Sequence, residues 1–306
     1  MNVGRRAFVT SCAALAVGAG TTGCLDGNGG DGTGDGTDGE NGTGDDGNED
    51  GTGDGTNGDG IPEPTEADYA TWLFDPETVS REIETHGISY KEPASVPMSA
   101  RAGNVDTFDA YDSFISVGNS ATVFDFASEE VFAGEMDGWG LTEAEPVEER
   151  GNYAVYNMVE ENNIIFGVDF EEMLVIGSGY DGVTRAIIHT RIGDAEPYTQ
   201  TNDDMGLLIE TLGGGHVAEG QDEGFSENAT AAGIVKNGNE DGTVDVRAVE
   251  VFPDEQTVDT VAFEEGVLNV FENRYDDDTL EIDEVQQDGR VAVAVGTSDG
   301  GIYFQG

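Results

Sequence analysis

The sequence predicts an α+β fold in which antiparallel sheets of hairpins carry helices packed on one face. Short apolar runs are separated by turn-forming pairs such as Asp288-Gly289, which is the pattern of antiparallel hairpins. Helical segments do not alternate regularly with these runs, so a doubly wound parallel sheet is not favoured. The order strand, helix, paired strands occurs twice, in 122–159 and 249–295. We therefore expect two tandem similar subdomains, at 61–197 and 198–306.

The first subdomain is expected to begin with a helix at 76–86. Asp75 is a suitable N-cap and Pro76 suits the first helical turn. A second helix is expected at 128–137. Apolar runs between polar turns predict strands at 111–117, 153–159, 163–168 and 172–177.

Two helices are expected around the boundary between the subdomains. Val183, Ile187 and Ile188 form an apolar stripe on a helix at 182–191, and leucines do the same on a helix at 203–212. A boundary is expected either at 193–203, between these helices, or in the glycines that follow at 213–215.

The C-terminal third repeats the theme of hairpins and a helix. Asp254 is expected to cap a helix at 255–273. The expected strands are 229–235 and 244–252, joined by a turn at Asn237-Gly238 and Asp241-Gly242, and 279–286 and 290–297, joined at Asp288-Gly289.

Composition excludes several classes of partner. The 306 residues include 64 acids and 12 lysines and arginines, for a formal net charge of −52. Such a chain repels nucleic-acid phosphates, so we expect no nucleic-acid partner, and it also repels an anionic membrane surface. Residues 61–306 hold 53 of the acids, so most of the charge belongs to the folded region.

The first 24 residues have the three parts of an export signal. Arg5 and Arg6 precede an apolar stretch of about 14 residues, which includes Phe8 and is too short to span a bilayer as a helix. The stretch ends at Thr21-Thr22-Gly23-Cys24. The Arg-Arg-x-Phe core resembles a twin-arginine signal, and the last residues resemble a lipoprotein-processing box.

This resemblance implies that residues 1–23 are removed and that Cys24 becomes the lipidated first residue of the mature chain. Cys12 lies in the removed part, so no intramolecular disulfide is expected. The implied partners are the membrane, through the lipid at Cys24, and transiently the export machinery. The expected location is the extracellular face of the cytoplasmic membrane.

Residues 24–60 are expected to form a disordered tether behind that anchor. All 35 residues from 26 to 60 are Gly, Asp, Glu, Asn or Thr, so none of them can bury apolar surface. The segment also contains a glycosylation sequon at Asn41, and a second sequon lies at Asn228 in the folded region.

The folded region resembles proteins of extreme halophiles in its charge. Lys91 and Lys236 are its only lysines, against 53 acids. Together with the signal, this resembles secreted haloarchaeal lipoproteins, although the folded region itself matches no family that the motifs identify. Self-repulsion of this size predicts unfolding when the salt falls below about 1 M.

A search for catalytic motifs favours a non-catalytic role. The sequence has no nucleophile elbow, P-loop or Cys-x-x-Cys, and no cofactor is expected. Structural roles are favoured for His86, His189 and His216. The run Asp276, Asp277 and Asp278 could gather a hard cation such as Ca²⁺ or Mg²⁺, although a solvated loop is the favoured interpretation.

Three functions are compatible with these features. The favoured one is a lipid-anchored surface protein of a halophile that binds or scaffolds an unknown ligand or protein. The alternative is a substrate-binding lipoprotein of a transporter. A third is an extracellular hydrolase that uses carboxylates.

Overall fold

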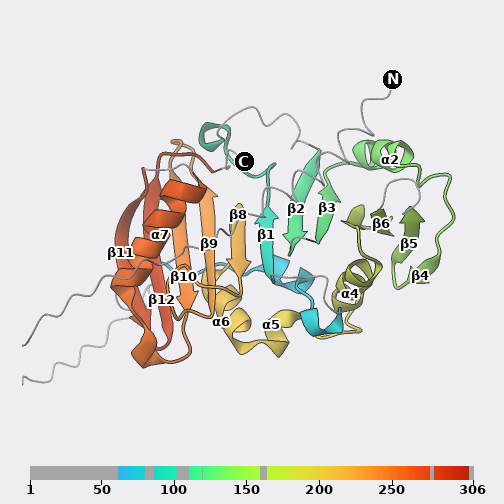
Figure 1. The fold of residues 1–306 in the computed structure, drawn as a ribbon. Helices are drawn as coiled ribbons and strands as arrows, with labels where there is room; N and C mark the ends of the chain where they lie inside the picture. The colour runs from blue at the N-terminus through green and yellow to red at the C-terminus, as the bar shows by residue number, and fades with distance from the viewer. Residues whose placement is uncertain are drawn as a thin grey trace, which may run out of the picture.

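The computed structural model describes residues 61–79, 86–101, 110–118, 120–158, 164–275 and 279–302. In this part of the chain, twelve strands form one antiparallel sheet in the order β11-β12-β10-β9-β8-β1-β2-β3-β7-β6-β5-β4 (Figure 1). The antiparallel α+β fold predicted from the sequence is therefore confirmed.

The two halves of the chain contribute to this sheet separately. The first half supplies β1 (Gly87–Lys91), β2 (Tyr111–Val117), β3 (Ala121–Phe126), β4 (Glu148–Arg150), β5 (Tyr153–Met158), β6 (Ile164–Asp169) and β7 (Leu174–Ser178). The second supplies β8 (Val217–Gln221), β9 (Ala231–Gly238), β10 (Val244–Val251), β11 (Glu281–Asp288) and β12 (Val291–Ser298). The halves meet where β1 pairs with β8 over five residue pairs.

Among the described residues, four longer helices and several short helical turns accompany the strands. The helices are α2 (Glu129–Gly138), α4 (Asp181–Arg191), α6 (Asp203–Leu212) and α7 (Thr260–Arg274), with a single turn, α5 (Tyr198–Thr201), before α6. The 3₁₀ turns are η1 (Asp68–Trp72), η2 (Pro76–Thr78), η3 (Met98–Ala100) and η4 (Glu255–Thr257). None of the helices in the described ranges is long and apolar enough to cross a bilayer.

The helices cover both faces of the sheet, whereas the sequence analysis expected helices on one face. On face A, defined as the face carrying η1, α4 and α6, Ile187 and Leu208 pack in one core with Val123 and Val249. On face B, defined as the face carrying α2 and α7, two separate cores lie under the two helices. Both faces are covered because apolar residues occupy successive positions in strands such as β6, where all six residues are buried.

The halves share one topological feature. In the first, β3 leads into α2 and the later strand β7 returns to pair with β3; in the second, β10 leads into α7 and β12 returns to pair with β10. In both cases the returning strand is antiparallel to the strand before the helix. Tandem duplication remains a prediction that this likeness motivates.

Two expected helices differ in the structure. Asp75 does accept a hydrogen bond from the Glu77 amide, but the structure shows only η2 there, and residues 80–85 of the expected helix lie outside the described ranges. The helix expected at 255–273 begins at Thr260. Asp254 is the N-cap of η4 and forms a capping box with Thr257, and Asp259 is the N-cap of α7.

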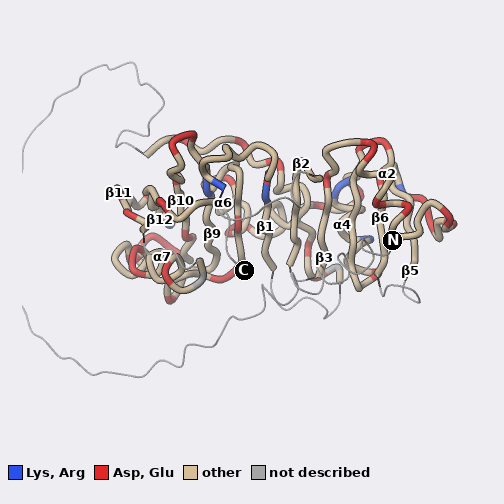
Figure 2. Tube along the Cα trace, turned by 90° about the horizontal axis from the view of Figure 1, so that it is seen from above, with Lys and Arg blue, Asp and Glu red and all other residues tan. Residues whose placement is uncertain are grey.

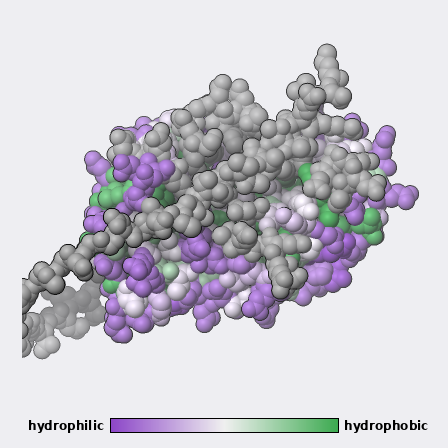
Figure 3. All heavy atoms as spheres, viewed as in Figure 1, coloured by the Kyte–Doolittle hydropathy of each residue, from purple (hydrophilic) through white to green (hydrophobic). Residues whose placement is uncertain are grey.

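Acidic residues follow the whole described trace, whereas basic residues are sparse (Figure 2). On the coloured part of the surface in Figure 3, hydrophilic residues are prominent and hydrophobic areas are smaller. Within the described ranges, the ion pairs of Lys and Arg whose partners are identified are Arg150–Asp194, Arg185 with Glu148 and Asp181, and Arg290–Asp204. Most surface carboxylates therefore face solvent and one another.

Candidate functional site

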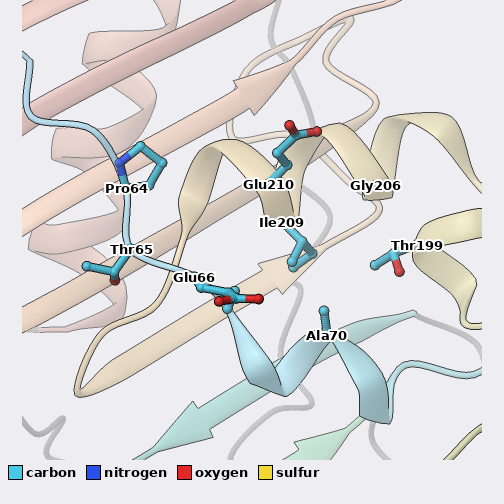
Figure 4. Close-up of a pocket in the computed structure, with 9 residues that line it drawn as sticks. Pro64, Thr65, Glu66, Ala70, Thr199, Gly206, Ile209 and Glu210 are labelled. Carbon is cyan, nitrogen blue, oxygen red and sulfur yellow. The ribbon is translucent and has the colours of Figure 1, made fainter. Parts of the chain in front are cut away.

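Two hollows flank the N-terminal segment of the described fold on face A. The larger, the α6 groove, has a volume of about 630 Å³ and lies between η1 and α6 (Figure 4). The residues that line it are Pro64, Thr65, Glu66, Ala67, Ala70, Thr199, Gly206, Ile209 and Glu210.

The α6 groove has an apolar floor and acidic rims. Ile209 points from α6 toward Ala70 of η1, and Glu66 and Glu210 lie to either side (Figure 4). Gly206 lets α6 approach the turn before it, because a Cβ there would stand 2.4 Å from the Thr199 carbonyl oxygen. The groove therefore lies where α5 and α6 approach each other closely, and residues 64–70 form its other wall.

The smaller hollow, the β1–β8 cavity, has a volume of about 290 Å³ at the end of the two strands that join the halves. Its lining residues are Thr65, Glu66, Asp68, Tyr69, Tyr90, Glu92, Gly214, Gly215, His216 and Asn237. Thr65 and Glu66 line both hollows, so the two adjoin at this segment.

Hydrogen bonds hold the aromatic and acidic side of the β1–β8 cavity. The Tyr90 hydroxyl donates to one carboxylate oxygen of Glu92, and Ser95 Oγ donates to the other at 3.0 Å. The Tyr69 hydroxyl donates to the Gly213 carbonyl at 2.7 Å, and its ring stacks on that of Tyr90 with centroids 5.3 Å apart. Burial and then the Glu92 carboxylate raise the pKa of Tyr90, so the phenol stays protonated.

The opposite side of this cavity is formed by His216 and Asn237. The His216 amide donates to the Asn237 side-chain oxygen at 3.2 Å, and His216 Nδ1 lies 3.1 Å from the Gly238 amide, which donates to it. Nδ1 is therefore an acceptor, and burial lowers the pKa of the imidazole. Both observations indicate a neutral His216 with its proton on Nε2.

Most of the site residues predicted from the sequence fall outside the part of the chain that the structure describes. Arg5, Arg6, Phe8, Cys24, Asn41 and the run 276–278 lie outside the described residues. Asn228 is described: it is exposed, has a φ of 75°, and lies in the loop between β8 and β9. The Thr230 hydroxyl of its sequon donates to the Val251 carbonyl at 3.2 Å, so this part of the sequon is engaged in the fold.

The fold also brings together residues that sequence reasoning did not connect. His86 precedes β1, and its Nδ1 lies 2.9 Å from Asp222 Oδ2 at the end of β8. Its Nε2 is buried without a hydrogen-bond partner among the described residues. The two residues are 136 positions apart, and only the unpredicted pairing of β1 with β8 could have indicated their contact.

Burial raises the pKa of three carboxylates outside the hollows, Asp125, Glu135 and Glu250. Burial, followed by the charge of Asp112, raises the pKa of Asp125 to about 6. Burial also raises the pKa of Glu250, which is fully enclosed on face B and accepts hydrogen bonds from the amides of Phe225 and Ser226. None of the three residues is among those that line the two hollows.

Neither metal ligands among the described residues nor similarity to known proteins identifies a further site. Across the described ranges, no three His, Cys, Asp or Glu side chains are grouped so that they could hold a metal ion. No protein-family model matches the chain, and no curated protein is detectably similar to it.

Proposed function

We propose that this chain is a lipid-anchored, non-catalytic binding protein on the outer surface of a halophile, with the two adjoining hollows as its binding surface. The observation that carries the binding role is their construction. Side chains from 64–70, the ends of β1 and β8, β9 and α6 converge, and they are fixed by hydrogen bonds to one another. Pre-formed hollows with a few oriented polar groups are typical of binding sites.

The continuous sheet favours this proposal over a transporter's substrate-binding lipoprotein. Such a protein is expected to bind its ligand in a cleft between two lobes. Here β1 and β8 pair directly, and the face A core includes residues from both halves, such as Val123 and Val249. The hollows lie over this junction rather than between separated lobes.

The anchoring part of the proposal is tested by replacing Cys24 with Ser. The wild-type chain is expected in the membrane fraction, because two acyl chains on Cys24 would hold it there. The C24S variant is expected in the medium. A C24S protein that stayed with the membrane as the wild type does would contradict the anchor.

The binding part is tested by affinity capture from detergent-solubilised membranes in molar salt, followed by mass spectrometry. Glu66 lines both hollows and is exposed, so E66R changes their charge without removing a buried contact. The matched control is E264R on α7, which is on the opposite face and also exposed. We expect a specific partner with the wild type and E264R that is lost with E66R. Equal recovery by all three would place binding elsewhere, and recovery of a permease would favour the transporter alternative.

A further inference from the structure

We infer that residues 61–74, the strap, are a brace across the sheet, and that release of this brace would let the sheet bend at β1. The strap lies on face A and precedes β1 in the sequence. Its buried residues belong to the face A core: Ile61, Tyr69, Trp72, Leu73 and Phe74. The brace does not depend on the proposed binding function, but it would control the shape of the two hollows, because strap residues line both of them.

The beginning of the strap is attached to the second half of the sheet. The Arg247 guanidinium of β10 donates a hydrogen bond to the Pro62 carbonyl. Thr65 is bonded twice to Gly214, in the connection between α6 and β8. Its carbonyl accepts from the Gly214 amide at 3.0 Å, and its hydroxyl donates to the Gly214 carbonyl at 3.1 Å.

The end of the strap is attached to the first half. Arg191, the last residue of α4, lies over Trp72, with its guanidinium carbon 4.6 Å from the ring centre, and donates to the Thr71 hydroxyl at 3.0 Å. Phe74 forms an isolated β-bridge with Pro197, just before α5. The strap is therefore bonded to elements on both sides of β1.

The strap crosses the sheet at the strand where the cores on face B are interrupted. Phe114 of β2 belongs to the core under α2, and Val217 of β8 belongs to the core under α7. Within the described residues, β1 lies between these strands and adds no residue to either core. Val96 and Ala100, which follow β1, pack in the core under α7 and do not join the two cores. Bending of the sheet at β1 is therefore resisted by packing on face A, where the strap lies.

The strap also covers β1 directly and forms a wall that the hollows share. The Tyr69 ring stacks on that of Tyr90 in β1, with centroids 5.3 Å apart. Thr65 and Glu66 line both hollows, and Figure 4 shows their segment beside α6. Release of the strap would remove this shared wall.

Gly214 offers a specific means of displacing the strap. A Cβ at this position would stand 2.5 Å from the Glu66 carbonyl oxygen and 3.2 Å from Thr65 Oγ1, and the three nearest atoms all belong to the strap. The φ of Gly214 is not positive, so alanine causes no backbone strain of its own there. Gly134→Ala on α2 is the matched control, because no atom lies within 4 Å of its Cβ position.

The first measurement is hydrogen exchange of the full mature chain in molar KCl, followed by mass spectrometry. G214A should speed exchange in the strap and in β1 by about tenfold or more, whereas G134A should leave both unchanged. Tyr69→Phe keeps the ring but removes the hydroxyl that donates to the Gly213 carbonyl. Y69F should speed strap exchange by about two- to tenfold, so it tests the brace even if G214A fails to fold.

The second measurement is the distance between spin labels at the two ends of the sheet. E149C on β4 and E264C on α7 place the labels at exposed positions, in a chain in which Cys24 is replaced by Ser. Pulsed electron resonance should give one narrow distance distribution with the wild-type strap and a broader one with G214A or Y69F.

Strap exchange that did not change in Y69F and in any folded G214A would overturn the inference. A distance distribution that stayed narrow while strap exchange rose would overturn it as well, because the strap would then be free without the sheet bending. Failure of the brace is distinguishable from failure of the proposed function, since the capture of a partner that depends on Glu66 is measured separately on membranes.

Discussion

At the scale of single residues, burial of carboxylates is the most informative feature of this acidic chain. Most of its acids lie at the surface, where water and salt reduce the cost of their charge. Asp125 and Glu250 differ because the fold encloses them and raises the pKa of each. Each therefore gives a prediction about stability.

Asp125→Asn is expected to stabilise the protein at neutral and higher pH. The pKa of Asp125 is raised to about 6 in the folded state, so the folded state holds this proton more tightly than the unfolded state. Wild-type stability from this group is therefore present at low pH and is lost as the pH rises through about 4 to 6. Above that window D125N should be about 1 kcal/mol more stable, allowing for partial exposure, and at about pH 4 the two should converge.

Thermal unfolding of both proteins at the two ends of this pH range, in molar salt, measures the effect. Glu240→Gln is the control, since Glu240 is exposed in the turn after β9. A D125N advantage that was equal at both ends of the range would show that the titration of Asp125 is not its cause.

Glu250→Ala is expected to destabilise the protein by about 2–4 kcal/mol. The substitution leaves the Phe225 and Ser226 amides and the Ser226 hydroxyl without the carboxylate that accepts from them. Glu250→Gln keeps an accepting oxygen for the amides and should cost less. Denaturant unfolding of both variants measures the order; similar losses in the two would show that the oxygen kept by glutamine does not support the Phe225 and Ser226 amides.

At the scale of elements, polar side chains cap the N-termini of the helices α2, α6 and α7. Ser128 precedes α2, and its Oγ accepts from the Val131 amide at 3.3 Å. Ser128→Ala should therefore cost about 1 kcal/mol, while Ser128→Thr should retain most of the cap. Chemical denaturation compares the two; equal stability of S128A and the wild type would show that this cap contributes nothing.

How well each strand could be predicted depended on how many of its faces are covered. Strands such as β6 and β7 are buried on both faces and appear in the sequence as apolar runs, so they were predicted within about two residues. β1 and β8 were not predicted. On face B, Val217 joins the core under α7, but the other positions include Ser89, Lys91 and Glu219, so neither strand appears in the sequence as an apolar run.

The candidate site was missed for the same reason. Tyr90, Glu92, His216 and Asn237 meet only because β1 and β8 pair and β9 lies beside β8. Tyr90 and Glu92 are more than 100 residues from His216 and Asn237 in the sequence, and no local motif marks the long-range pairing. The sequence did identify Asp75 and Asp254 as caps, because a cap depends on neighbours two or three residues away.

At the scale of the whole molecule, the most prominent property of the chain is its formal net charge of −52. The fold places acidic residues along most of its described length, and few of the ion pairs described there offset them (Figure 2). Repulsion between unpaired carboxylates opposes a compact state at low ionic strength and is screened in molar salt, where the Debye length is about 3 Å. The central claim is that this charge is an adaptation to concentrated salt, within which the two hollows bind their ligand.

Calorimetric unfolding of the mature chain across a series of KCl concentrations tests that claim most directly. Screening of several kcal/mol of repulsion should raise the melting temperature by on the order of 10 °C between low and molar salt, with loss of the folded state at the dilute end. Sodium chloride at equal ionic strength should act similarly, because the effect is one of screening. A melting temperature that did not change with salt would contradict the claim.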